Sequence, residues 1–341
     1  RFRRDEQRSS LQHGLRQSRE GRQAVPTTRW RSLTVTDQPL NSFCVDLEEW
    51  FHICGVTTDY TDPDTWDAAP SYVVQDTETL MRLLDETGSK GTFLPVGWVA
   101  ERYPDLIRRL VDAGHEIGCH SYFHRLVFDL TPEEFDADIE QCVKVLREVS
   151  GQPVTAFRAP GFSIKRECFW AYPILRKHGI DVDVSIVPAR RDHGGVEGFR
   201  RDPFLLHTEA GDVKCFPVSV MNIAGRSIPF SGGGYLRLFP NWLIDRGYRQ
   251  NHRAGRPGMS YIHPREINPD QPRMKLPALK SFKYYVNLDK TLGKLRHSLE
   301  RYQFTTIEET LKSVKDWPEY ELAAGEILPC DDASASPAGA A

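Results

Sequence analysis

Short apolar runs alternate with amphipathic segments along most of this chain, and this alternation constrains its fold more than any other feature. Runs typical of β-strands occur at 42–47, 91–96, 154–158, 180–186, 213–218 and 259–263. Apolar residues recur with helical spacing at 73–87, 131–149, 165–178, 240–250 and 285–302. Such alternation predicts an α/β fold with a largely parallel sheet, either closed as a (β/α) barrel or open. In a barrel, functional side chains gather at the carboxyl ends of the strands.

The two ends of the chain differ in composition from the part between them. Residues 1–38 hold nine arginines against three acidic residues through Arg31, without apolar periodicity, so we expect a disordered basic tail. A nucleic-acid-binding arm is the less favoured alternative, because only two aromatic residues, Phe2 and Trp30, stand among these arginines. Residues 321–341 are rich in Ala, Ser and Pro, and we expect them to be disordered too. One folded domain is then expected over 39–320.

Composition excludes several classes of protein. The net charge of −3 gives no indication of a nucleic-acid partner or an anionic membrane. No apolar run approaches the roughly 20 residues that span a bilayer, and no secretory signal is evident. The seven cysteines include no Cys-x2-Cys pair, which favours reduced thiols. We therefore expect a cytoplasmic protein, with peripheral association with the inner membrane left open and the oligomeric state unspecified.

The stretch that begins at Gly114 is typical of a short apolar strand that follows a helix, and it ends in two histidines four positions apart, His120 and His124. On a helical turn, positions i and i+4 share one face, so both imidazoles would point at one ion. A catalytic metal site adds a carboxylate and keeps one position open. Taken alone, the spacing is common and lacks the glutamate of a zincin motif. The competing interpretation is that one or both histidines only form hydrogen bonds with backbone groups of the loop.

Reactive side chains stand at the ends of five predicted strands. They are Asp46 with Glu48, His120 with His124, Arg158, Asp183 and His263. Each alone has a structural explanation, such as a helix cap or a surface ion pair. Together they suit metal-assisted hydrolysis, in which a carboxylate and two histidines hold a divalent ion that lowers the pKa of a bound water to about 7. A second carboxylate then serves as base, and a protonated histidine serves as acid toward the leaving amine.

Several motifs resemble those of the NodB-homology polysaccharide deacetylases, carbohydrate esterase family four. These motifs are 114–127, 157–163 and 261–266. The motifs at 229–237, 263–273 and 285–290 resemble the branch that accompanies exosortase (PEP-CTERM) exopolysaccharide gene clusters. The resemblance spans about residues 41–312. It implies an α/β fold, a distorted (β/α) barrel of the NodB-homology type with a single catalytic domain.

The resemblance also implies roles for individual residues. Asp46 would be the base, and His263 the acid. His120 and His124 would bind the metal. Arg158 would tether Asp46, and Asp183 would orient His263. The backbone N–H of Gly161 would donate to the oxyanion that forms during the reaction.

The first motif departs from the family pattern. Many relatives have two adjacent aspartates there, base and then ligand, whereas Leu47 follows Asp46 in this chain. The carboxylate ligand must then be Glu48 or Glu49. The spacing of Asp46 and Glu48 places both on one side of an extended chain, which favours Glu48 as the metal ligand. Glu49 would be a loop residue or a substrate contact.

The expected activity is hydrolysis of N-acetyl groups from amino sugars of an exopolysaccharide or its precursor, so the expected partner is an N-acetylated polysaccharide or oligosaccharide. The cofactor would be a divalent metal, Zn²⁺ first, although Co²⁺, Ni²⁺ and Fe²⁺ suit the same ligands. One alternative is hydrolysis of a non-sugar amide or cyclic ureide on the same barrel. Another is a non-catalytic carbohydrate-binding barrel, which would not need paired proton-transfer groups. Arg237 and Arg265 either bind an anionic sugar or pair with acidic neighbours.

Overall fold

The computed structural model describes residues 39–191 and 194–330. The tail expected over 1–38 and the last eleven residues of the tail expected after 320 lie outside this part of the chain. None of the helices described here combines the length and the apolar character needed to cross a bilayer.

A parallel sheet at the centre of the fold carries the longest buried strand. Its order is β10 (Met259–Ile262), β1 (Asn41–Leu47), β2 (Thr92–Pro95) and β3 (Glu116–Ile117), and β11 (Phe304–Thr305) pairs with the start of β1. Every residue of β1 is buried, which is typical of a strand covered on both faces. The predicted strands 42–47, 91–96 and 259–263 are therefore confirmed.

The second sheet continues the first. Its order is β13 (Glu326–Pro329), β12 (Glu319–Ala323), β6 (Phe204–His207), β7 (Val213–Cys215), β5 (Val182–Asp183) and β4 (Ala156–Phe157). A parallel bridge from Cys119 to Phe157 links the end of β3 to β4. The parallel strands thus follow one another from β10 to β7 as the wall of a distorted (β/α) barrel. A separate hairpin pairs β8 (Val220–Ile223) with β9 (Arg226–Pro229).

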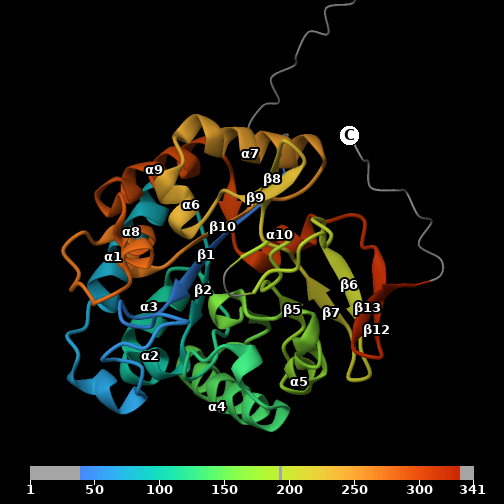
Figure 1. Cartoon of the computed structure of the whole chain (residues 1–341), viewed down its shortest axis with the longest axis horizontal. Helices are drawn as coiled ribbons and strands as arrows, with labels where there is room; N and C mark the ends of the chain where they lie inside the picture. Colours follow the sequence, from blue (N-terminus) through green and yellow to red (C-terminus); the bar gives the residue numbers. More distant parts are fainter. Residues whose placement is uncertain (1–38, 192–193, 331–341) are drawn as a thin grey trace, which may run out of the picture. The chain divides into compact units, whose positions relative to one another are not determined.

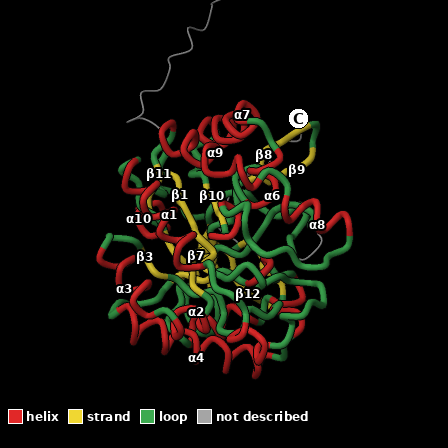
Figure 2. Tube along the Cα trace, turned by 90° about the vertical axis from the view of Figure 1, so that its left-hand side faces the viewer, coloured by secondary structure: helices red, strands yellow, loops and turns green. Residues whose placement is uncertain are grey.

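Helices cover the strands on both sides. Figures 1 and 2 show α7 and α9 on one side of the strands and α2 and α4 on the opposite side. The helices are α1 (Val73–Glu86), α2 (Gly97–Arg102), α3 (Pro104–Asp112), α4 (Pro132–Ser150), α5 (Ala171–Lys177), α6 (Gly233–Leu238), α7 (Asn241–Arg253), α8 (Ala278–Tyr285), α9 (Leu288–Arg301) and α10 (Ile307–Lys312).

Local signals place α4 accurately. The Thr131 hydroxyl accepts the N–H of Glu134, and the Glu134 carboxylate accepts the N–H of Thr131, so both sides of a capping box are present. At the other end, Gly151 adopts a left-handed conformation with φ of 66°. The helix expected over 165–178, with a kink or division at Pro173, is divided before that residue into a short 3-10 turn at 166–168 and α5.

The C-terminal boundary of the domain lies further along the chain than expected. Residues 319–323 form β12 and 326–329 form β13, and β12 pairs in parallel with β6. The prediction of disorder from residue 321 is wrong for 321–330. The reason is that β12 gains a partner strand more than a hundred residues away, and Ile327 is buried. The composition that suggested disorder belongs mainly to 331–341.

Candidate active site

The predicted site residues converge on one edge of the barrel. Asp46 lies in β1 and Glu48 follows its end, while His120 follows β3, Arg158 follows β4 and His263 follows β10. Parallel strands present their carboxyl ends at the same edge of the barrel. Residues more than 200 positions apart therefore face one another.

An irregular loop positions the histidine pair. Ser121 and His124 have φ of 65° and 54°, in the left-handed region, so the segment is not helical and the expected shared helical face is wrong. The carboxylate of Asp138 in α4 accepts the N–H of Tyr122 at 2.8 Å and holds the loop against the barrel. The imidazole centroids of His120 and His124 are 5.1 Å apart.

Glu48, His120 and His124 form a cluster suited to a metal ion. One ligand atom from each lies within 4.8 Å of the other two. Oε2 of Glu48 is 2.6 Å from Nε2 of His124 and 4.0 Å from Nε2 of His120. This oxygen is buried, and apart from its short contact with His124 it has no hydrogen-bond partner among the described residues. A buried carboxylate oxygen that faces two imidazole nitrogens is a donor set that a divalent cation satisfies.

The contacts of His120 and the charge of Glu48 favour this use. Nδ1 of His120 lies 2.7 Å from the carbonyl oxygen of Arg158, so Nδ1 carries the hydrogen and Nε2 keeps its lone pair. Burial lowers the pKa of His120 to about 4, and this imidazole is neutral. Burial raises the pKa of Glu48, but His124, His263 and His120 outweigh this and lower it to about 2. The carboxylate is therefore ionised.

The neighbouring carboxylate, Glu49, points away from this cluster. It accepts the hydroxyl of Ser71 and the N–H groups of Tyr72 and Val73 at about 3.3 Å, where α1 begins. The first N–H groups of a helix lack internal partners, and Glu49 supplies them with an acceptor. Of the two glutamates that the sequence left open, only Glu48 faces the histidines.

Asp46 is held by a buried arginine. Nη1 of Arg158 lies 2.5 Å from Oδ1 of Asp46, and the guanidinium carbon is 5.4 Å and 5.5 Å from the ring centroids of Phe162 and Tyr261. The other carboxylate oxygen, Oδ2, lies 3.7 Å from Nε2 of His263. The ion pair thus leaves one oxygen of Asp46 directed at the histidine.

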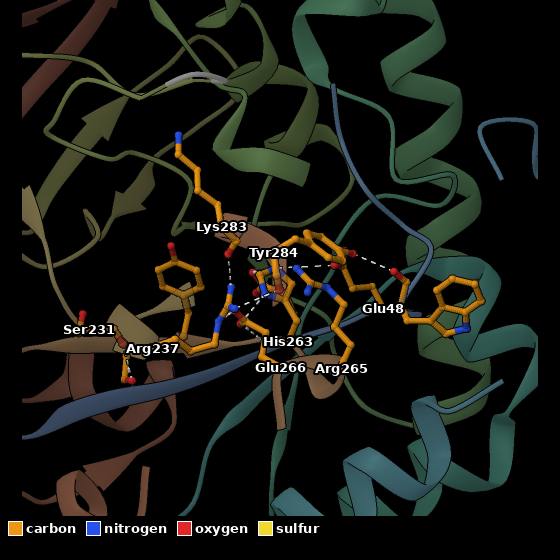
Figure 3. A network of polar contacts seen from close by, with 12 residues as sticks. Glu48, Ser231, Arg237, His263, Arg265, Glu266, Lys283 and Tyr284 are labelled. Atoms are coloured by element: carbon orange, nitrogen blue, oxygen red, sulfur yellow. Dashed lines mark hydrogen bonds and ion pairs between the residues drawn. The ribbon is translucent and has the colours of Figure 1, made fainter. Parts of the chain in front are cut away.

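His263 is oriented by a residue that the sequence analysis did not assign. Its Nδ1 lies 2.9 Å from Oε2 of Glu266, and Nε of Arg237 donates to Oε1 of Glu266 at 2.9 Å (Figure 3). Asp183 instead accepts the N–H of Ser185 and the hydroxyl of Tyr172. The expectation that Asp183 orients His263 is wrong, because β5 directs this carboxylate toward α5.

A local signal for Glu266 was present in the sequence. His263 precedes a 3-10 helix (Pro264–Ile267) with proline at its first position, and Glu266 at the third position accepts the N–H of His263 at 3.1 Å. Burial lowers the pKa of His263, but Glu48, Glu266 and Asp46 outweigh it and raise the pKa above its ordinary value. Burial also opposes ionisation of Glu266, yet Arg237 and His263 hold its pKa well below the usual range.

A cavity of about 590 Å³ opens over these residues. Asp46, His120, His263 and Gly161 contribute to its lining. Gly161 has φ of 62°, and a Cβ added there would lie 2.9 Å from Cδ2 of Leu126, so the position favours glycine. Its role as oxyanion donor stays a prediction.

Two family models match adjacent parts of the chain. Residues 64–182 match the model described as polysaccharide deacetylase. We call these residues, which make up less than half of the chain, the deacetylase segment. Residues 184–312, which follow the deacetylase segment, match a domain of unknown function (DUF3473).

The chain is similar to curated deacetylases over limited lengths. The chain is 27% identical over 108 residues to the peptidoglycan-N-acetylglucosamine deacetylase of Bacillus cereus, covering 31% of this chain and 38% of that protein. It is 33% identical over 97 residues to the chitooligosaccharide deacetylase of Azorhizobium caulinodans, covering 28% of this chain and 45% of that protein. The chain thus spans less than half of these curated relatives.

A solved structure supports the barrel independently. A Mycobacterium smegmatis protein classed as a polysaccharide deacetylase superposes with a TM-score of 0.53 at 18% identity, covering 81% of this chain and 90% of that chain. This likeness concerns the fold, and it agrees with the expected barrel of the NodB-homology type.

The site draws on both matched regions. The deacetylase segment supplies His120, His124 and Arg158, whereas the region of unknown function supplies His263 and Glu266. Asp46 and Glu48 precede both regions. The two matched regions therefore form one site rather than two separate ones.

Proposed function

We propose that this chain is a metal-dependent deacetylase that hydrolyses N-acetyl groups of amino sugars in an exopolysaccharide or its precursor. The observation that carries the proposal is the convergence of Asp46, Glu48, His120, His124 and His263 beside one cavity, which Asp46, His120 and His263 help to line. The names of the relatives support N-acetylated amino sugars as the substrate class. Exopolysaccharide as the polymer rests on the motifs at 229–237 and 263–273.

Glu48, His120 and His124 would hold the divalent ion, and Zn²⁺ suits two imidazoles and one carboxylate. When bound, the ion supplies a Lewis acid toward the acetyl carbonyl and lowers the pKa of water. The hydrogen bond from His120 to the carbonyl oxygen of Arg158 fixes the ring so that Nε2 faces the cluster.

Asp46 and His263 would move the protons. Oδ2 of Asp46 takes a proton from the attacking water while Arg158 holds Oδ1. Nε2 of His263 then gives a proton to the leaving amine, and Glu266 holds its Nδ1. The separation of 3.7 Å between Oδ2 and Nε2 lets both groups reach one amide bond. The N–H of Gly161 would stabilise the oxyanion.

Release of acetate from N-acetylglucosamine oligomers by the zinc-loaded protein tests this proposal. Asp46→Asn should retain zinc and lose about 10²- to 10⁴-fold in kcat, because general base catalysis contributes that much. His120→Ala should lose both zinc and turnover. Asp59→Asn, an exposed carboxylate outside the site, is the charge-matched control.

Other outcomes would favour the alternatives. Oligomer binding without acetate release, by a protein that has bound zinc, would indicate a carbohydrate-binding barrel. Hydrolysis of a non-sugar amide or cyclic ureide, without action on the oligomers, would move the substrate class away from sugars. Near-normal kcat in Asp46→Asn would remove Asp46 from the role of base.

A further inference from the structure

Two arginines beside the site, Arg237 and Arg265, have different surroundings. Arg237 is fully engaged by protein groups. Its Nε donates to Glu266 at 2.9 Å, and its Nη atoms donate to the carbonyl oxygens of Lys283, Tyr284 and Val286 at 2.8–3.0 Å. The positive charge of Arg237 is thus offset by a buried carboxylate, and this arginine supports Glu266 rather than a ligand.

Arg265 is equally enclosed but lacks such partners. Arg265 is 7% exposed, and its buried Nε and Nη1 atoms have no hydrogen-bond partner within the part of the chain that the structure describes. Among the described residues, no carboxylate forms an ion pair with it within 4.0 Å. A buried donor left unsatisfied costs about 1–3 kcal/mol, and more for a charged group. An arginine maintained in this state is a candidate for binding an anion.

The orientation of Arg265 is fixed by an aromatic ring. Its guanidinium carbon lies 3.4 Å from the ring centroid of Tyr284 (Figure 3). The hydroxyl of Tyr284 donates to the carbonyl oxygen of Trp50 at 2.8 Å, which anchors the ring. A stacked guanidinium keeps its planar set of donors preorganised for two-point contact with an oxyanion.

The described residues that line the cavity around Arg265 include further arginines. Arg265 lines the same cavity as His120 and His263, and Arg190 and Arg191 also line it. Among the described lining residues, the carboxylates are Asp46 and Glu266, and each is already paired with an arginine. The field in the cavity therefore favours an anionic ligand.

We propose that Arg265 binds an oxyanion of the substrate, so that the glycan acted on is acidic. This inference rests on the proposed function for the position of the reacting amide. The oxyanion is a carboxylate in an acidic sugar or a phosphate in a phosphorylated glycan, since both present two oxygens to the guanidinium.

Calorimetric binding to the zinc-loaded full chain tests the subsite without turnover. One pair of probes is a tetrasaccharide of alternating N-acetylglucosamine and glucuronic acid and its carboxyl methyl ester. The other pair is N-acetylglucosamine 1-phosphate and N-acetylglucosamine. The charged member of at least one pair should bind about tenfold to a hundredfold more tightly than its neutral partner, the effect of a hydrogen-bonded charge pair. The pair that shows this preference identifies the oxyanion.

Arg265→Gln should abolish the preference, and Arg265→Lys should retain part of it. Arg226→Gln, an exposed arginine of β9 outside the cavity lining, should keep the wild-type preference. Equal affinity within both pairs of probes, including no measurable binding of any probe, would overturn the proposal. So would an unchanged preference in a folded Arg265→Gln protein. If Arg265→Gln does not fold, the proposal is tested by the affinities of the wild-type protein for the charged and neutral probes, together with those of Arg265→Lys.

The outcomes separate this proposal from the proposed function. Acetate release from neutral oligomers without a preference for charged probes would remove the subsite alone. A preference for charged probes without acetate release from any N-acetylated oligomer would retain the subsite and remove the function.

Discussion

Replacing Glu266 by glutamine tests how His263 is positioned. The Glu266 carboxylate accepts hydrogen bonds from Nε of Arg237 at 2.9 Å, from Nδ1 of His263 at 2.9 Å and from the N–H of His263 at 3.1 Å. A glutamine offers one acceptor oxygen and one donor NH₂ group. Arg237 and His263 both donate to this side chain. The amide oxygen of glutamine can accept from one of them, and the other then faces the NH₂ group, which is also a donor.

The expected magnitude follows from these contacts. A hydrogen bond that involves a charged group contributes about 1.5–3 kcal/mol, and the same loss in the transition state lowers kcat about 10- to 150-fold. Stability should also fall. Arg237 loses its buried counter-ion but keeps three carbonyl acceptors, so the free energy of unfolding should drop by about 3 kcal/mol, the lower end for breaking a buried pair.

The assay is kcat for acetate release, with zinc content and urea unfolding measured on the same preparations. Asp183→Asn is the matched control. This substitution also neutralises a buried carboxylate, but the carboxylate of Asp183 does not contact His263. The kcat of Asp183→Asn should stay within about tenfold of the wild-type value. This reduction is smaller than the one expected when a hydrogen bond to a charged group is lost in the transition state. Wild-type kcat in Glu266→Gln together with a large loss in Asp183→Asn would refute this reasoning.

Three further predictions concern stability and the metal. Burial raises the pKa of Asp183 to about 6, so the stability that the protonated carboxyl contributes is present below pH 4 and is lost as pH rises through 6. The free energy of unfolding of Asp183→Asn in urea, relative to wild type, should therefore increase by about 3 kcal/mol between pH 4 and pH 6. A difference that does not change with pH would contradict this. Glu49→Gln should retain one zinc per chain by elemental analysis, because Glu49 caps α1; loss of zinc would make it a ligand. Deleting residues 319–341 should lower Tm by circular dichroism, because β12 covers the edge of β6; an unchanged Tm would remove this role.

The sequence predicts the parts of the site that depend on local patterns. Apolar periodicity locates β1 and β10, and their ends carry Asp46 and His263. The carboxyl ends of parallel strands meet at one edge, so convergence of these residues follows from the fold class alone. Local helix signals likewise placed α4 to within a residue.

The sequence does not predict features that depend on distant contacts. The left-handed conformation of His124 depends on a loop pinned by Asp138, which lies in the next helix. β12 forms because β6 provides a partner across the sheet. The direction of Asp183 depends on the packing of β5 against α5, and sequence alone does not distinguish it from Glu266 as the partner of His263.

The most direct test of the central claim is anomalous diffraction from a crystal of this protein soaked in zinc. The account predicts one ion within about 2.0–2.2 Å of Nε2 of His120, Nε2 of His124 and a carboxylate oxygen of Glu48. An ion bound elsewhere, or coordinated by Glu49 in place of Glu48, would contradict it.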